Sequence, residues 1–124
     1  MSLKVIVTRD FDHMSEVAAE VVQDRICREI AAKGKFVLGL ATGNSPTGLY
    51  KFLAKAVNRG HVTAERITSF NLDEYVGLPG ENAQARALHR ESYSFFMIEE
   101  LFGLMRTKFS EPHVPWGCLI AQEK

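Results

Sequence analysis

The chain has 124 residues, enough for one domain or for part of a larger one. Its 15 basic residues balance its 15 acidic ones, so no net charge favours binding to nucleic acid or to an anionic membrane. No apolar run approaches the roughly 20 residues that a membrane-spanning helix needs. Because the first residues also lack the pattern of a signal peptide, we expect a cytoplasmic protein. The two cysteines show no paired spacing, which predicts reduced thiols and no metal site.

The first part of the chain predicts a strand and then a long helix. Residues 3–7 are rich in β-branched apolar side chains, which favours a strand. Residues 13–32 carry apolar side chains at every fourth position, which predicts a helix with Asp12 or Ser15 as its N-cap. Cys27 lies near this apolar stripe and is expected to be a small core residue.

Residues 36–60 predict a buried strand, a tight polar turn and a second helix. The continuous apolar run at the start is typical of a strand buried on both faces. Ser45 is the expected N-cap, Pro46 the expected first helical residue, and Gly60 the expected left-handed end. Such a turn presents backbone N–H groups to an anion, although an ordinary strand-to-helix turn needs the same residue types.

A third strand is predicted at residues 67–72, and two carboxylates, Asp73 and Glu74, follow it directly. The resulting strand–helix–strand order favours a parallel sheet with right-handed crossovers. Ligands of such sheets bind beyond the carboxyl ends of the strands. The acidic pair therefore marks either a binding site at this edge or simply a polar turn.

The remaining sequence predicts a long polar connection at residues 80–90, which is a candidate binding or lid segment, and a helix at residues 92–105. Residues 106–124 show weak periodicity. Together these elements predict an α/β fold, a Rossmann-like three-layer αβα arrangement with a mainly parallel sheet.

Two segments resemble the glucosamine-6-phosphate deaminase (isomerase) family. They are Leu-Gly-Leu-Ala-Thr-Gly-Asn-Ser-Pro-Thr-Gly-Leu-Tyr at 38–50 and Phe-Asn-Leu-Asp-Glu-Tyr-Val-Gly-Leu-Pro at 70–79. The Glu-Ser-Tyr segment at 91–93 is also similar. The related 6-phosphogluconolactonases typically carry Asp-Glu-Arg where this chain has Asp-Glu-Tyr at 73–75, which favours the deaminase branch.

The resemblance implies conversion of glucosamine 6-phosphate to fructose 6-phosphate and ammonia, without a cofactor or metal. It assigns removal of the sugar C2 proton to Asp73, through an enolamine intermediate, and leaves Glu74 as a possible supporting residue. It also implies a phosphate-binding loop made of Thr42, Gly43, Asn44 and Ser45.

The resemblance covers residues 1–105, which correspond to the first half of a family member, and residues 106–124 form a divergent tail. The family's ring-opening residues and the basic residues of its phosphate site belong to the second half, and the chain has no counterpart of them.

A non-catalytic sugar-phosphate-binding module and a 6-phosphogluconolactonase-like hydrolase are therefore the alternative functions. A truncated domain leaves apolar surface uncovered, so we expect a homo-oligomer.

Overall fold

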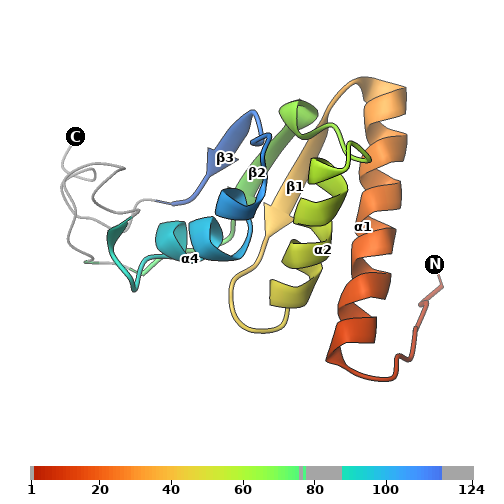
Figure 1. Cartoon of the computed structure of the whole chain (residues 1–124), viewed down its shortest axis with the longest axis horizontal. Coiled ribbons are helices and arrows are strands. Elements are labelled where there is room, and N and C mark those ends of the chain that lie inside the picture. Colours follow the sequence, from red (N-terminus) through yellow and green to blue (C-terminus); the bar gives the residue numbers. More distant parts are fainter. Residues whose placement is uncertain (1, 76, 78–87, 116–124) are drawn as a thin grey trace.

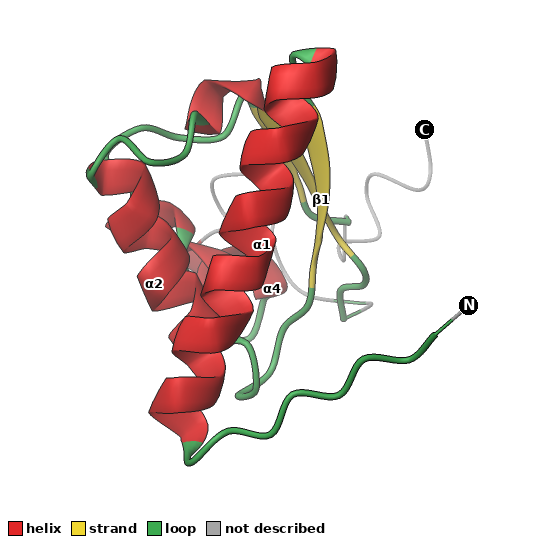
Figure 2. Ribbon diagram, turned by 90° about the vertical axis from the view of Figure 1, so that its right-hand side faces the viewer, coloured by secondary structure: helices red, strands yellow, loops and turns green. Residues whose placement is uncertain are grey.

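The computed structural model describes residues 2–75, 77 and 88–115 (Figure 1). In this part of the chain, three parallel strands form one sheet, and three α-helices pack on one of its faces (Figures 1 and 2). The α-helices and strands are, in chain order, α1 (Phe11–Lys33), β1 (Phe36–Leu40), α2 (Thr47–Asn58), β2 (Ile67–Asn71), α4 (Tyr93–Glu100) and β3 (Glu111–His113). The described residues also form two short 3-10 helices, η1 (Ala64–Arg66) and η2 (Phe102–Leu104).

The strand order is β1-β2-β3. β1 pairs with β2 in parallel from Phe36 opposite Ile67 to Leu40 opposite Asn71, and β2 pairs with β3 in the same direction. The predicted parallel α/β fold is confirmed, and the described residues form two of the three expected layers. β3 was not predicted, because its three residues lie in the weakly periodic region after residue 105 and include Pro112.

The core lies between the sheet and the helices. Along β1 and β2, alternate side chains point toward the helices, and Leu40 and Ile67 are almost fully buried there. Helix side chains fill the other side of this layer. The most deeply buried of them are Ile26, Leu53, Met97 and Leu101.

The N-cap of α1 is Asp10, whose carboxylate accepts a hydrogen bond from the His13 backbone N–H at 2.8 Å. The prediction of Asp12 or Ser15 as the cap was wrong, since the helix begins earlier. Cys27 is exposed, and its thiol donates a hydrogen bond to the His61 carbonyl at 3.3 Å. The expected core position of this cysteine was therefore also wrong.

Residues 3–7 form no strand, which contradicts the prediction. The segment runs away from the sheet as a loop, with Leu3 and Val7 about nine-tenths exposed (Figure 2). A strand is stabilised by backbone hydrogen bonds to a neighbouring strand. None of the strands in the described residues lies beside this segment, so its apolar pattern alone does not produce one.

The ends of α2 and α4 also differ from the prediction. Pro46 is the N-cap of α2 and provides no side-chain hydrogen bond, so Ser45 does not have the expected capping role. At the other end, Gly60 has φ 80° as predicted. α4 has the N-cap Ser92 but stops at Glu100, because the backbone leaves the helical region at Leu101. A 3-10 turn follows it.

The expected connection at residues 80–90 lies mostly outside the described residues, as does the end of the tail. Among the helices that the structure describes, none is long and apolar enough to cross a membrane.

Candidate functional site

The phosphate-loop residues and the acidic pair lie at the same edge of the sheet. β1 ends at Leu40 and β2 ends at Asn71, and these two residues are partners across the parallel pair. Residues 42–45 follow the first strand and Asp73 follows the second. The sheet therefore brings together the two motifs, more than twenty residues apart in the sequence, at its carboxyl edge, as parallel topology predicts.

The loop at residues 42–45 enters α2 with three exposed residues in a row, Gly43, Asn44 and Ser45. Gly43 has φ 97°, a left-handed conformation that favours glycine. The Thr47 hydroxyl donates to the Asn44 carbonyl at 2.9 Å and so holds the turn against the helix. Within the described residues, the backbone N–H groups of the three exposed residues have no hydrogen-bond partner. They remain available to an anion at the N-terminus of a 12-residue helix.

Tyr50 holds the start of this loop in place through a hydrogen bond. Its side chain is buried, and its hydroxyl donates a hydrogen bond to the Ala41 carbonyl. Burial raises the pKa of the Tyr50 hydroxyl to about 12. Sequence reasoning included Tyr50 only in the family motif and missed this link, because an aromatic residue in a helix is usually just core.

Gly48 positions the first turn of α2. A Cβ at this residue would lie 2.1 Å from the Ser15 Oγ and 2.9 Å from the Phe11 ring, so glycine allows α2 to approach α1 closely. The loop at the start of α2 therefore depends on the packing of these two helices. A glycine next to the N-terminus of a predicted helix was the only signal of this contact in the sequence.

Asp73 and Glu74 are adjacent but have different surroundings. Asp73 is exposed, and its carboxylate accepts no hydrogen bond from any residue that the structure describes. Glu74 is half-buried, and its carboxylate oxygens accept hydrogen bonds from the backbone N–H of Tyr93 at 2.9 Å. It therefore caps the start of α4.

Two aromatic residues lie beside this acidic pair. The rings of Tyr75 and Tyr93 have centroids 4.9 Å apart. Hydrogen bonding with Tyr93 raises the pKa of Tyr75, and the nearby charges of Asp73 and Glu91 act in the same direction. The contact connects the acidic turn to the Glu-Ser-Tyr segment that the resemblance singled out.

Sequence reasoning missed Asn71. Its side chain is 6% exposed, and neither its amide nitrogen nor its amide oxygen has a hydrogen-bond partner in the described part of the chain. A buried amide without partners is costly, and such groups collect at functional sites. An asparagine at the end of a predicted buried strand was the available signal.

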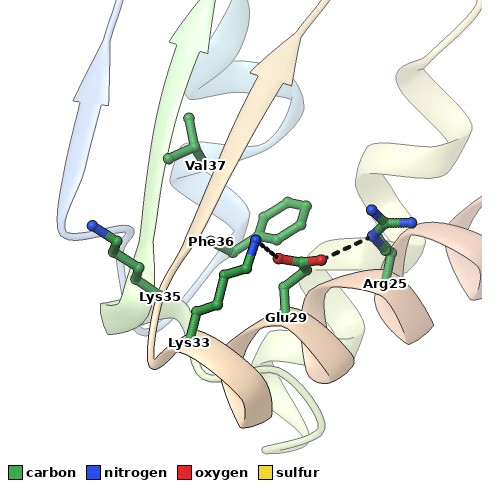
Figure 3. Close-up of a pocket in the computed structure, with 6 residues that line it drawn as sticks. All are labelled: Arg25, Glu29, Lys33, Lys35, Phe36 and Val37. Carbon is green, nitrogen blue, oxygen red and sulfur yellow. Dashed lines mark ion pairs between the residues drawn. The ribbon is translucent and has the colours of Figure 1, made fainter.

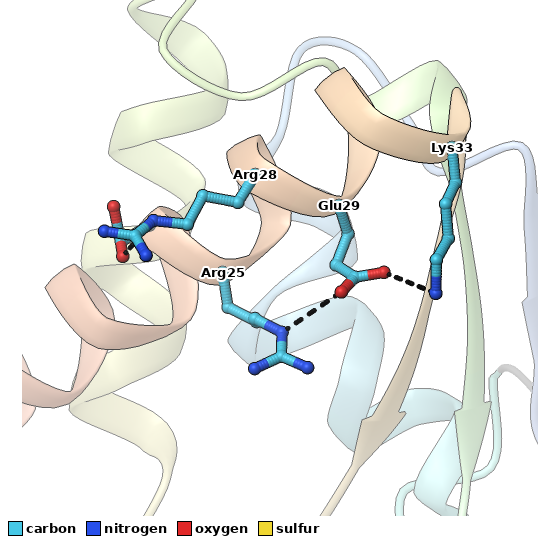
Figure 4. Close-up of polar contacts among 5 residues, drawn as sticks. Arg25, Arg28, Glu29 and Lys33 are labelled. Atoms are coloured by element: carbon cyan, nitrogen blue, oxygen red, sulfur yellow. Dashed lines mark ion pairs between the residues drawn. The ribbon is translucent and has the colours of Figure 1, made fainter.

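A separate pocket of about 550 Å³ lies at the opposite, amino end of β1 (Figure 3). Its charged groups come mainly from the end of α1, where Glu29 pairs with Arg25 at 3.4 Å and with Lys33 at 3.1 Å (Figures 3 and 4). The Lys33 ammonium, through its hydrogen bond and its charge, lowers the pKa of Glu29. This pocket is distant in the strand direction from the predicted site, and two of its cations, Arg25 and Lys33, already have Glu29 as an acidic partner.

No group of three histidine, cysteine or acidic side chains in the described ranges could hold a metal ion. The four histidines have no predicted catalytic role.

Comparison with known proteins gives one consistent match. A glucosamine-6-phosphate deaminase of Thermoanaerobacter sp. (strain X514) is 38% identical over 115 residues, which are 93% of this chain and 41% of the relative. A deaminase of Clostridioides difficile (strain 630) is 41% identical over 122 residues, which are 98% of this chain and 45% of the relative. No family model matches the chain.

Comparison with solved structures also matches the chain to a glucosamine-6-phosphate deaminase. The structure of a monomeric glucosamine-6-phosphate deaminase matches with a TM-score of 0.75 and 32% identity, over 93% of this chain and 43% of that one. A 6-phosphogluconolactonase from Thermotoga maritima matches with a TM-score of 0.67 over 88% of this chain and 44% of its own. At 18% identity, the lactonase match shows the fold alone.

The fold and the sheet-edge site thus define the Rossmann-like α/β class that the deaminases and lactonases share. Within this class, the chain corresponds in sequence and structure to the N-terminal part of a glucosamine-6-phosphate deaminase, which confirms the resemblance seen in its motifs. The chain spans less than half the length of the curated relatives it matches.

Proposed function

We propose that the chain supplies the phosphate-binding loop and the proton-abstracting carboxylate of a sugar-phosphate isomerase/deaminase. In a complete domain these groups would serve the conversion of glucosamine 6-phosphate to fructose 6-phosphate and ammonia. The observation that carries the proposal is the pairing of Leu40 with Asn71, which brings the loop and Asp73 to one edge of the sheet. The division at residue 105 stays a prediction, and β3 lies beyond it.

The loop would hold the phosphate group of the sugar. Three backbone N–H groups, those of Gly43, Asn44 and Ser45, are without partners among the described residues, and the positive end of the α2 dipole lies beside them. The hydroxyls of Thr42 and Ser45 add side-chain donors. Phosphate is the anion that such a combination of backbone and hydroxyl donors suits best.

Asp73 would act as the general base. It removes the C2 proton of the open-chain sugar to give the enolamine, and a proton is then returned at C1. Water hydrolyses the resulting imine of fructose 6-phosphate, which releases ammonia. Its exposed carboxylate is not held by hydrogen bonds within the described chain, so it can face a sugar whose phosphate occupies the loop. Glu74 supports it indirectly, because its carboxylate fixes the start of α4 beside the same turn.

We also propose a cytoplasmic location and self-association of the isolated chain. Large apolar side chains are exposed at its N-terminal segment and on its sheet, and exposed apolar patches promote association. One matched deaminase is monomeric, and its chain is more than twice as long as the part that matches this chain. Homo-oligomers would therefore be a property of this chain when it is alone.

The alternative is a module that binds the sugar phosphate without turning it over, which the loop geometry alone would also serve. Titration of the chain with glucosamine 6-phosphate, followed by amide NMR, tests the shared binding step. We expect the amide resonances of residues 43–45 to shift. Thr42→Val with Ser45→Ala should weaken binding by about tenfold, and the matched variant Thr63→Val, on an exposed residue outside the loop, should not. Unchanged loop resonances would refute the proposed phosphate site.

A further inference from the structure

A groove of about 360 Å³ lies between α1 and α2, and none of its lining residues belongs to the loop or to the acidic turn. The two helices lie side by side and run in the same direction (Figures 1 and 2). Near their starts, Gly48 lets α2 approach Ser15 closely. Further along, the Cys27 thiol donates its hydrogen bond to the His61 carbonyl. The groove lies between these two contacts, so its walls are held in place at both ends.

Small side chains form the floor of this groove. Ala19 of α1 and Ala56 of α2 are 5% and 6% exposed, and both line the groove. Binding sites for small molecules begin at about 300 Å³, so the groove is large enough for one small metabolite. Apart from Phe52, its other lining residues carry polar or charged groups. Such a lining favours a charged ligand over an apolar one, because apolar ligands would leave these groups without partners.

The two walls of the groove carry opposite charges. α1 contributes Glu16 and Glu20, which are one helical turn apart and therefore lie on one side of that helix. α2 contributes Lys55 and Arg59 at the same spacing. His61 follows these two residues in the chain and adds its imidazole ring to the same wall. Carboxylates of one helix thus border a space that they share with cations of the other.

These charges do not neutralise one another. Elsewhere on α1, acidic and basic side chains form ion pairs at 3.0 to 3.4 Å (Figure 4). Within the described ranges, the charged side chains of the groove at positions 16, 20, 55 and 59 form no ion pair. The Lys55 ammonium instead lies over the Phe52 ring, 5.4 Å from its centroid, a contact that orients it. Both signs of charge therefore remain available to a ligand.

We propose that this groove binds a small zwitterion that carries an ammonium group and a phosphate group a few bonds apart. The ammonium group would face the carboxylates of Glu16 and Glu20. The phosphate group would accept hydrogen bonds from Lys55 and Arg59. Both of these side chains donate to phosphate, and charge-assisted hydrogen bonds are stronger than neutral ones. A ligand of this kind bridges two charged walls that do not pair with each other directly.

Ligands with a single charge suit the groove less well. One exposed ion pair contributes little to affinity, because water and salt screen it. An anion alone would also lie near the two carboxylates, and a cation alone near the two basic groups, where like charges repel each other. A zwitterion avoids this repulsion and contacts both walls at once. The site is independent of the proposed function, since it shares no residue with the loop or with Asp73.

The test titrates the full chain with three probes and follows the titration by amide NMR. Phosphoethanolamine carries both charged groups, whereas inorganic phosphate and ethanolamine carry one each. We expect phosphoethanolamine to shift the amide resonances of Ala19, Gln23 and Ala56 in a saturable way. Each single-charge probe should bind the groove at least about tenfold more weakly, because it contacts only one wall.

Substitutions on each wall are compared with matched controls. Glu20→Gln and Lys55→Gln each remove one charge and should weaken the binding of phosphoethanolamine about fivefold. Lys51→Gln, at an exposed residue of α2, and Glu65→Gln, at an exposed residue of η1, lie outside the groove and should leave binding unchanged. Circular dichroism melting checks that all four variants fold.

Three results would overturn the inference. The groove amides could fail to shift with phosphoethanolamine, a single-charge probe could bind the groove as tightly, or the control variants could weaken binding as much as the groove variants. Inorganic phosphate separates this test from that of the proposed function, because it should shift residues 43–45 while binding the groove weakly. Shifts at residues 43–45 without shifts in the groove would refute the groove site alone. The opposite result would refute the proposed phosphate loop alone.

Discussion

The carboxylate of Glu74 accepts hydrogen bonds from the backbone N–H of Tyr93 at 2.9 Å, through both of its oxygens. It thereby joins the turn after β2 to the N-terminus of α4. A carboxylate at a helix N-terminus satisfies an otherwise unpaired donor and complements the helix dipole. The two adjacent acidic residues therefore differ: Glu74 holds the start of α4, whereas the Asp73 carboxylate accepts no hydrogen bond from the residues that the structure describes.

The first prediction concerns this cap. Glu74→Gln removes the negative charge but keeps one acceptor oxygen, so it should lower the free energy of unfolding by about 1 kcal/mol. Glu99→Gln, at an exposed residue of the same helix, is the control and should change it by less than about 0.5 kcal/mol. Urea unfolding measures both. Equal stabilities of the two variants would show that the hydrogen bonds to Tyr93 contribute nothing.

The second prediction concerns Gly48. Gly48→Ala would force a Cβ to within 2.1 Å of the Ser15 Oγ, so α1 and α2 must separate. We expect a loss of about 1–3 kcal/mol in the free energy of unfolding. Gly39→Ala is the matched control, because a Cβ there meets nothing within 4 Å. If both alanine variants unfold at the same urea concentration, the close contact between α1 and α2 does not require glycine at residue 48.

The third prediction is a pH dependence at Tyr50. Its folded-state pKa is raised from 10.0 to about 12, so the folded chain retains a proton that the unfolded chain releases first. This contribution to stability is full below pH 10 and is lost as the pH rises through about 12. Tyr50→Phe should lack that decline, although it also loses the hydrogen bond to Ala41. Parallel unfolding curves of the two proteins from pH 9 to pH 12 check the difference, and identical slopes would contradict it.

The strands and helices that bury apolar side chains could be predicted from the sequence. The run from Phe36 to Leu40 predicted β1 correctly, because a short apolar segment between polar turns has few other uses. Its predicted burial on both faces was wrong for the described residues, since Val37 is 61% exposed. The same reasoning failed at residues 3–7. Local pattern indicates that a segment can form a strand, whereas the strand itself requires a neighbour.

The candidate site was predictable in composition but not in contacts. Motif resemblance selected the loop and the acidic pair, and parallel topology predicted that they share an edge. The different surroundings of Asp73 and Glu74 could not be predicted, since the hydrogen bond to Tyr93 joins residues 19 positions apart in the sequence. Likewise, the buried amide of Asn71 and the contact between Gly48 and Ser15 depend on how the elements pack.

The proposed assignment of Asp73 as the general base is tested most directly by kinetics on a completed domain. The chain is fused to the remaining part of the Clostridioides difficile deaminase, and turnover of glucosamine 6-phosphate is measured for Asp73→Asn and Glu74→Gln. Asp73→Asn should lower kcat by about 10²–10⁴, the usual contribution of a positioned general base, and change KM little. Glu74→Gln should lower kcat less. A larger loss of kcat for Glu74→Gln, or an undiminished kcat for Asp73→Asn, would contradict the assignment.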